Sequence, residues 1–238
     1  MVMKLIPTIA SKGGVGKTLV SINVAYSLKE LGYKVGLLDL DLTMPAVTKY
    51  LKLHGINPGT GKQLEPVDCN GVQVLSAGLL MDKDQPVTVT AEMRRNIVSQ
   101  FVGKTQWNVD YLVIDTPPGS NDELMELINN YRSSILGCIV VTTPSDTAIN
   151  EVRRSLELIR REKLPLIGII GNFMGFECIS CHTMNNLFTN GHANPVDSLA
   201  EDFRTTVLAT LPLYSATDSE PLHFVPVMVL ALDSTKLF

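Results

Sequence analysis

The chain has 238 residues, of which 45% are hydrophobic and 18% charged, and its formal net charge is −4. This balance is typical of a globular protein with a large core, and it excludes a disordered chain, a collagen-like repeat and a small disulfide scaffold. The acidic excess argues against a general nucleic-acid-binding protein. The length suits one large domain, so we expect residues 1–238 to form a single domain.

Two features concern the compartment in which the protein works. No apolar run reaches the roughly 20 residues needed to span a bilayer, and no signal peptide precedes the first strand-like segment. We therefore expect a cytoplasmic protein without a membrane partner. The four cysteines of such a chain favour thiols or metal ligands over disulfides.

Short apolar runs alternate along the chain with amphipathic segments of helical length. The predicted strands are 3–10, 34–39, 72–76, 111–115, 135–142, 166–172 and 207–211. The predicted helices are 18–31, 92–102, 122–131 and 147–162. This alternation predicts an α/β fold in which a mostly parallel sheet carries helices on both faces. Such sheets bind ligands at the carboxyl ends of their strands, where the glycines and acidic residues of this chain gather.

A glycine-rich turn follows the first predicted strand and consists of Ser11, Lys12, Gly13, Gly14, Val15, Gly16, Lys17 and Thr18. Its glycines would let successive N–H groups point at phosphate oxygens, and the next helix offers its positive end to the same anion. Lys17 would place a charge at the β- and γ-phosphates, while the Thr18 hydroxyl would ligate Mg²⁺. A dinucleotide loop is the competing interpretation, but it needs a third glycine where Leu19 stands. The turn therefore predicts a P-loop that binds ATP with Mg²⁺, in a variant that has Ser11 in place of the usual glycine.

Acidic residues end two of the predicted strands. Asp39 and Asp41 lie two residues apart after strand 34–39, and Asp115 ends the apolar run 111–115. An apolar strand that ends in aspartate is typical of a Walker B carboxylate, which holds a magnesium-bound water. Such an acid can also simply cap the next helix. Because two acidic sites accompany one P-loop at the same sheet edge, we assign Asp115 to the magnesium site.

The segment from Lys12 to Thr18 resembles the deviant Walker A loop of the MinD/ParA/NifH class of P-loop ATPases. The resemblance implies a homodimer closed by ATP, in which Lys12 reaches the partner's nucleotide and stabilises charge on the transferring phosphate. It further implies that Asp41 orients the attacking water and that Asp39 lies deeper, near magnesium. Asn172, which closes strand 166–172, resembles the asparagine of this class that hydrogen-bonds the adenine, although a turn-forming asparagine is the alternative.

Cys178 and Cys181 form a C-x-x-C motif after the same strand. They supply two soft ligands, half of a four-sulfur site, and a symmetric dimer would supply the other half. The segment resembles the Mrp/ApbC branch of the class, which implies a [4Fe–4S] cluster shared across a homodimer and passed to recipient proteins. A half zinc site, a redox pair and two incidental cysteines are the alternatives. Cys138 fits a core position, and Cys69 receives no role.

The residues and the resemblance together predict a homodimeric ATPase whose hydrolysis changes the dimer and so loads or releases an iron–sulfur cluster. The alternative is a positioning or partition ATPase of the MinD or ParA type. Its membrane form would need a basic amphipathic tail, whereas only Lys236 follows Pro221. Its DNA form would need a basic patch, for which the candidates are Arg153, Arg154, Arg160, Arg161 and Lys163, interleaved with glutamates.

Overall fold

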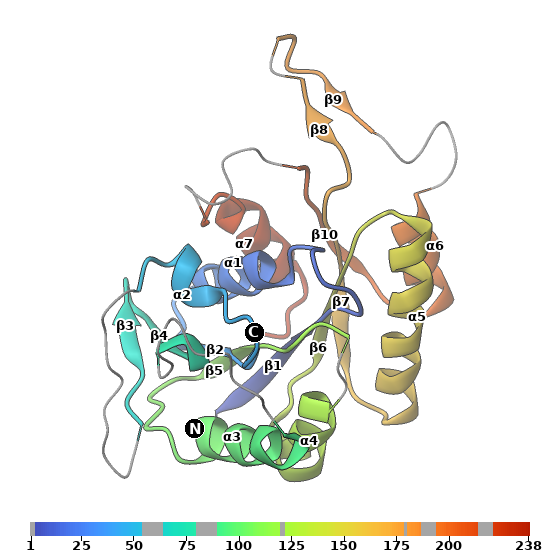
Figure 1. Ribbon diagram of the computed structural model, residues 1–238. Helices are drawn as coiled ribbons and strands as arrows, with labels where there is room; N and C mark the ends of the chain where they lie inside the picture. Colours follow the sequence, from blue (N-terminus) through green and yellow to red (C-terminus); the bar gives the residue numbers. More distant parts are fainter. Residues whose placement is uncertain are drawn as a thin grey trace.

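The computed structural model describes residues 3–53, 64–79, 90–119, 122–178, 180–186, 194–213 and 221–238. These residues form an eight-stranded sheet with the order β10-β7-β6-β1-β5-β2-β4-β3 and a separate hairpin, β8-β9 (Figure 1). Neighbouring strands of the large sheet run parallel, except that β3 pairs antiparallel with β4 at one edge. The predicted α/β fold with a mostly parallel sheet is confirmed.

The strands are β1 (Lys4–Ile9), β2 (Val35–Asp39), β3 (Val67–Cys69), β4 (Val72–Ser76), β5 (Tyr111–Asp115), β6 (Cys138–Thr142), β7 (Leu166–Gly171), β8 (Phe176–Glu177), β9 (Met184–Asn185) and β10 (Val207–Thr210). The helices are α1 (Lys17–Glu30), α2 (Val47–Tyr50), α3 (Ala91–Gly103), α4 (Asp122–Tyr131), α5 (Asp146–Arg161), α6 (Pro195–Asp202) and α7 (Val225–Ser234), with 3₁₀ turns at Ala77–Leu79 and Arg132–Ser134. Among these described helices, none has the length and apolarity needed to cross a bilayer.

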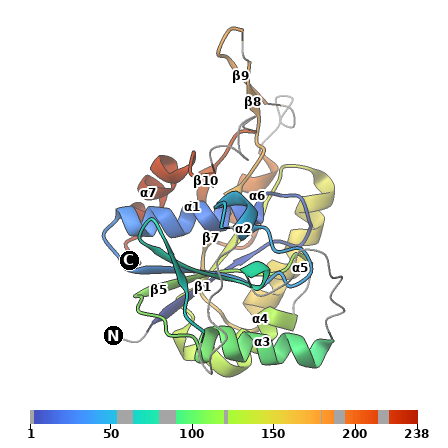
Figure 2. The same cartoon turned by 60° about the vertical axis from the view of Figure 1, so that its left-hand side comes forward.

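Helices cover both faces of the sheet, with α1 and α7 on one face and α3 to α6 on the other (Figures 1 and 2). Successive residues of a strand point to opposite faces. In β5, Leu112 and Ile114 therefore join the core beneath α3 and α4, whereas Val113 joins the core beneath α1. All three side chains are completely buried. Burial on both faces explains why β5 reads as a continuous apolar run.

The sequence pattern misses several elements, namely α2, β3, α6, α7 and the β8-β9 hairpin. Helix α7 occupies an apolar stretch with Pro226 in its first turn, where proline is tolerated because the N–H group has no intrahelical partner. The pattern also begins β6 three residues early. The chain leaves a 3₁₀ turn at Ser134, and Ile135 makes only an isolated bridge with Leu5 before regular pairing starts at Cys138.

The carboxyl ends of the central strands meet at the edge that carries the amino end of α1. Thr8 of β1 and Asp39 of β2 both pair in register with Asp115 of β5. The loop after β1 and the acids that end β2 and β5 are therefore neighbours, although more than a hundred residues separate the first from the last. The topology gathers the predicted nucleotide-binding residues at one place.

Candidate functional site

Residues 11–16 connect β1 to α1 and form the predicted phosphate loop. Gly14 and Gly16 have φ values of 80° and 82°, in the left-handed region that disfavours a side chain. A Cβ atom on Gly16 would lie 2.2 Å from Nδ2 of Asn172, so this position also has no room for one. Gly16 is the N-cap of α1, and the first turn of that helix contains no acidic residue. The loop thus offers an anion backbone N–H groups at the positive end of a helix.

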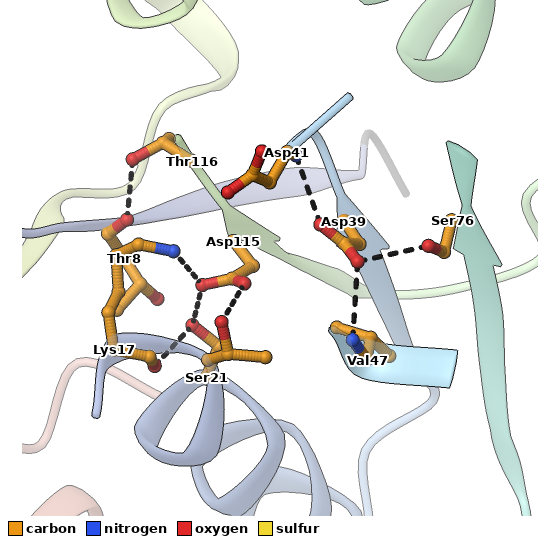
Figure 3. A network of polar contacts seen from close by, with 10 residues as sticks. Thr8, Lys17, Ser21, Asp39, Asp41, Val47, Ser76, Asp115 and Thr116 are labelled. Carbon is orange, nitrogen blue, oxygen red and sulfur yellow. Dashed lines mark hydrogen bonds and ion pairs between the residues drawn. The ribbon is translucent and has the colours of Figure 1, made fainter. Parts of the chain in front are cut away.

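The carboxylate of Asp115 accepts three hydrogen bonds from α1. Lys17 forms an ion pair with Oδ1 and Ser21 donates its hydroxyl to the same oxygen at 2.8 Å (Figure 3). Thr18 donates to Oδ2 at 2.7 Å. Lys17 is only 6% exposed and Asp115 is fully buried. The oxygens of Asp115 and Thr18 are hard ligands of the kind that Mg²⁺ prefers, so this donor set fits the metal.

Asp39 is buried in a network of donors beside this pair. Its Oδ1 accepts the backbone N–H of Asp41 at 3.0 Å, and its Oδ2 accepts the Ser76 hydroxyl at 2.9 Å and the backbone N–H of Val47 at 3.3 Å (Figure 3). Burial, and then the negative charge of Asp115, raise the pKa of Asp39 to about 7. The side chain fastens both ends of the 40–46 loop to the sheet.

Asp41 is the second residue of that loop and is buried, with 9% of its surface exposed. Its Oδ1 accepts the Thr43 hydroxyl at 2.8 Å and the backbone N–H groups of Thr43 and Met44 at 3.1 and 3.0 Å. These bonds hold the carboxylate at the sheet edge that carries Asp115. Lys12, in contrast to Lys17, is exposed on the phosphate loop.

Asn172 follows the last residue of β7 and lies beneath the phosphate loop. Its Nδ2 donates to the carbonyl oxygen of Val15 at 2.9 Å, and its backbone N–H donates to Thr142 at 2.8 Å. Its Oδ1 is buried without a hydrogen-bond partner among the described residues. The side chain therefore supports the loop and retains one buried acceptor oxygen. Its predicted bond to adenine stays a prediction.

The sequence interpretation overlooks three serines that organise the site. Ser21 lies one helical turn after Lys17, on the same face of α1, and this i, i+4 spacing is the signal that could have identified it. Ser76 ends β4 and contacts Asp39, while Ser155 of α5 lies 2.8 Å from the Ser11 hydroxyl. The contacts of Ser76 and Ser155 depend on strand order and helix packing, which the sequence pattern does not specify.

The cysteine pair lies apart from these residues, on the β8-β9 hairpin that projects from the sheet (Figures 1 and 2). Both cysteines are free, Cys178 half-buried and Cys181 exposed, and residue 179 between them lies outside the described part of the chain. The turn is closed by two backbone bonds, from Cys178 N–H to Thr183 at 3.0 Å and from His182 N–H to Cys178 at 2.8 Å. No group of three or more metal-ligating side chains occurs among the described residues, so within them the hairpin supplies two ligands.

Local hydrogen bonds favour the thiolate of Cys181. Its thiol donates to the Thr183 hydroxyl at 3.4 Å, and hydrogen bonding with the side chain and backbone of Thr183 and with Cys178 lowers the pKa of Cys181. Cys138 is the opposite case, because complete burial raises its pKa to about 12. Thiolates are the form that binds metal, so the hairpin is suited to soft metal ligation and Cys138 is a core residue, as expected.

The arginines of α5 line an open surface depression, but carboxylates pair with most of them. Arg153 contacts Asp202 at 2.6 Å, and Arg160 contacts Glu157 at 2.6 Å. Arg161 lies 3.5 Å from the adjacent Glu162. Positive and negative side chains thus alternate on the exposed face of α5, as on most solvent-exposed helices, and this face does not concentrate positive charge for DNA binding.

Comparison with known proteins identifies relatives over nearly the whole chain. The ParA family profile, described as "NUBPL iron-transfer P-loop NTPase", matches residues 1–235. The cytosolic Fe-S cluster assembly factor NUBP2 of Bos taurus is 34% identical over 220 residues, which cover 89% of this chain and 80% of the relative. The iron-sulfur cluster carrier protein of Aquifex aeolicus is 34% identical over 208 residues, covering 86% of this chain and 56% of the longer relative.

Solved structures confirm the fold. A nucleotide-binding protein from Archaeoglobus fulgidus, solved with ADP, superposes with a TM-score of 0.75 at 25% identity, covering 96% of this chain and 86% of the other. The septum site-determining protein MinD from Pyrococcus horikoshii, solved with Mg-ADP, superposes with a TM-score of 0.71 at 19% identity, covering 99% and 96% of the two chains. The likeness to MinD concerns the fold alone.

Proposed function

Because the chain belongs to the ParA family of NUBPL-type iron-transfer P-loop NTPases, we propose that it is a homodimeric ATPase that carries iron–sulfur clusters to recipient proteins. One observation carries the proposal: a phosphate loop with its acids and a pair of free thiols occur in the same chain. The proposal includes one P-loop ATPase domain over residues 1–238 and a cytoplasmic location, which the name of the cytosolic relative supports.

ATP would bind with its phosphates against the N–H groups of residues 11–16 and the start of α1. Lys17 would leave Asp115 and turn to the β- and γ-phosphates, which carry more charge than the carboxylate. When bound, Mg²⁺ neutralises part of the phosphate charge; Thr18 and Asp115 would hold it, partly through water, with Asp39 behind them. Asn172 would contact the adenine through its remaining acceptor oxygen.

Hydrolysis would depend on Asp41 and on a second protomer. The carboxylate of Asp41, held by the N–H groups of residues 43 and 44, would orient the attacking water. Lys12 of each protomer would reach the nucleotide of its partner and stabilise the charge that develops during phosphoryl transfer. Its exposure supports this role, since it has the freedom to cross an interface.

The cargo would be a [4Fe–4S] cluster bound by Cys178 and Cys181 from each of two chains. Two thiolates per chain are half of the four sulfur ligands that such a cluster needs. The lowered pKa of Cys181 supports ligation, because the thiolate is the ligand form. Nucleotide-driven opening and closing of the dimer would then load the cluster or release it to a recipient.

Anaerobic reconstitution with iron and sulfide tests the proposal. We expect a brown protein with about four iron atoms per dimer. Cys178→Ser and Cys181→Ser should each abolish the visible absorption, whereas the control variants Cys69→Ser and Cys138→Ser should retain it. A colourless protein with one zinc per dimer would replace cluster carriage by a structural zinc bridge. Absence of both metals, with ATP-dependent dimerisation intact in the double serine variant, would reject the metal role.

A further inference from the structure

The phosphate loop and the cysteine hairpin are joined by four consecutive residues, 172–175, which we call the neck. At its lower end, Nδ2 of Asn172 donates to Val15 of the loop at 2.9 Å. The side chains of Asn172 and Phe173 both lie close to Gly16. A Cβ atom on Gly16 would be 2.2 Å from Nδ2 of Asn172 and 3.5 Å from Cζ of Phe173. The neck thus contacts the loop at the two residues that precede Lys17.

At its upper end, the neck is fixed by backbone hydrogen bonds to the segment that follows β10, and it continues directly into the hairpin. The N–H of Met174 donates to Leu211 at 2.9 Å, and the N–H of Leu213 donates to Gly175 at 2.7 Å. Phe176 continues this ribbon as an isolated parallel bridge with Leu213 and as the first pair of β8 with β9. A Cβ atom on Gly175 would lie 2.5 Å from the carbonyl oxygen of the returning β9 strand.

The neck also contains a sharp change of direction. Phe173 adopts φ 57°, a left-handed conformation that is uncommon for a residue with a side chain. It allows the chain to turn away from β7 while its ring stays against Gly16. Five residues separate Asn172 from Cys178, and packing or hydrogen bonding holds the segment along this path.

We propose that Asn172, with Phe173, is a positioning residue that transmits nucleotide occupancy of the phosphate loop to the Cys178–Cys181 hairpin. The inference rests on the proposed function and deepens it, because it names the residues that connect ATP to the cargo site. A displacement of Val15 or Gly16 on phosphate binding moves the partner of the Asn172 amide. Packing and hydrogen bonds hold the residues of the neck in place, so a shift of the loop is passed along the neck and moves the hairpin.

Ser155 provides a matched control, because it also contacts the loop but does not lead to the hairpin. Its hydroxyl lies 2.8 Å from that of Ser11, and α5, to which it belongs, continues away from the cysteines toward β7. Ser155→Ala removes one side-chain contact with the loop, as Asn172→Asp does, while it leaves the neck intact. Asn172→Asp keeps the size of the side chain but replaces the donor to Val15 with an acceptor.

The test measures the alkylation rate of each cysteine by iodoacetamide, with peptide-resolved mass spectrometry, in the metal-free protein with and without Mg²⁺ and a non-hydrolysable ATP analogue. Cys181 is already exposed, so movement of the hairpin is expected to slow its alkylation. We expect about fivefold protection in the parent and in Ser155→Ala, the lower end of ordinary coupling between two sites. No protection is expected in Phe173→Leu or, at saturating nucleotide, in Asn172→Asp. Cys69, on β3 far along the sheet, is the internal reference and should not respond.

Light scattering and nucleotide titration on the same samples assign the outcome. Loss of protection in Phe173→Leu, with nucleotide affinity and dimer content like the parent, supports the inference, since this change removes the ring contact and keeps the amide bond. Equal protection in Phe173→Leu and parent overturns it, because dimerisation alone would then shield the thiols. If Phe173→Leu does not fold, Asn172→Asp decides by protection and dimer content at saturating nucleotide, because Asn172 also has a proposed role at the adenine. A parent that binds nucleotide and iron but shows no protection overturns the coupling alone, whereas a parent that binds neither overturns the proposed function.

Discussion

The buried carboxylate of Asp115 accepts hydrogen bonds from Lys17, Thr18 and Ser21. These bonds explain how the charged side chains of Lys17 and Asp115 can both be buried at the nucleotide site. An unpaired buried charge would be strongly destabilising, and the pairing with Asp115 removes that cost. The same arrangement keeps Lys17 within the loop that would receive phosphate. Lys17 and Thr18 therefore each have Asp115 as a partner in the structure and a second partner in the proposed reaction.

Lys17→Ala should weaken Mg-ATP binding by about two orders of magnitude, because it removes a charge-assisted contact worth up to ~3 kcal/mol. Calorimetric titration measures the effect. Lys29→Ala, at a partly exposed lysine in the last turn of the same helix, is the control and should bind like the parent. Unchanged affinity in Lys17→Ala would remove the phosphate-loop assignment.

Asp41→Asn should bind Mg-ATP normally and hydrolyse it more slowly, by roughly 10²-fold or more, as expected for loss of a water-orienting base. The asparagine oxygen retains the bonds from residues 43 and 44, so the loop keeps its shape. Single-turnover hydrolysis and titration separate the two effects. Loss of binding together with hydrolysis would contradict the water-positioning role.

Asp39 should make the stability of the nucleotide-free protein depend on pH. Its pKa is raised from an ordinary 3.8 to about 7, so between these values the folded chain keeps a proton that the unfolded chain has lost. The free energy of unfolding therefore falls as pH rises from about 4 to 7 and levels off above, by on the order of 1 kcal/mol or more. Urea denaturation with magnesium chelated should reveal this slope in the parent and in the control Asp233→Asn. The same slope in Asp39→Asn would assign it to another group.

At the scale of the elements, periodicity and apolar runs predict the strands and helices that are buried in the core. Strands buried on both faces, such as β5, and strongly amphipathic helices, such as α5, have unambiguous patterns. Helix α7 was missed because its apolar residues continue around the helix, and Leu230 remains 74% exposed. The two-residue strands β8 and β9 are too short for any period, so the cysteines could be identified but their hairpin could not.

The site was predictable to the extent that its residues belong to local motifs. The spacing from Gly13 to Thr18, and the acids that end β2 and β5, follow from chain order and the topology of parallel sheets. The contact of Asn172 with Val15 was not predictable, because it depends on how closely the end of β7 approaches the loop. Side-chain partners across elements require the packed structure.

Gly175→Ala should impair iron binding by the Cys178–Cys181 hairpin without affecting nucleotide binding by the phosphate loop. The new Cβ would lie 2.5 Å from the backbone oxygen of Asn185, so β9 must move and the pairing with β8 is disrupted. We expect iron content after reconstitution to fall severalfold, with Mg-ATP affinity unchanged. Ser180→Ala, an exposed change between the two cysteines, should reconstitute like the parent. Full iron loading in Gly175→Ala would mean that the cluster does not need this hairpin geometry.

At the scale of the whole molecule, two sites of the proposed function are incomplete in one chain. The hairpin supplies two sulfur ligands, whereas a cluster needs four. Lys12 is exposed on the phosphate loop, and its proposed role is at the nucleotide of the partner protomer. A symmetric dimer would complete both sites with the same operation. On the proposed function, dimer formation and ATP hydrolysis would therefore both depend on bound nucleotide.

Lys12→Ala should leave nucleotide binding by the monomer largely intact and weaken ATP-dependent dimerisation and turnover, since the lysine would act on the partner's phosphates. Light scattering with a non-hydrolysable analogue, followed by steady-state hydrolysis, measures both. Lys104→Ala, an exposed lysine just after α3 on the opposite helical layer, is the control. An identical nucleotide-induced dimer in Lys12→Ala and parent would count against a lysine that crosses the interface.

The ion pair between Lys17 and Asp115 has a consequence for the sequence of ligand entry. While the ammonium neutralises the carboxylate, a free divalent ion gains little by approaching it. On the proposed chemistry, polyphosphate would attract the lysine away and leave a buried carboxylate that requires a new counter-ion. Asp115 would therefore offer a charged ligand to a divalent ion only after the phosphates have bound. When the phosphates depart, Lys17 would neutralise Asp115 again, so the carboxylate would no longer favour a bound metal.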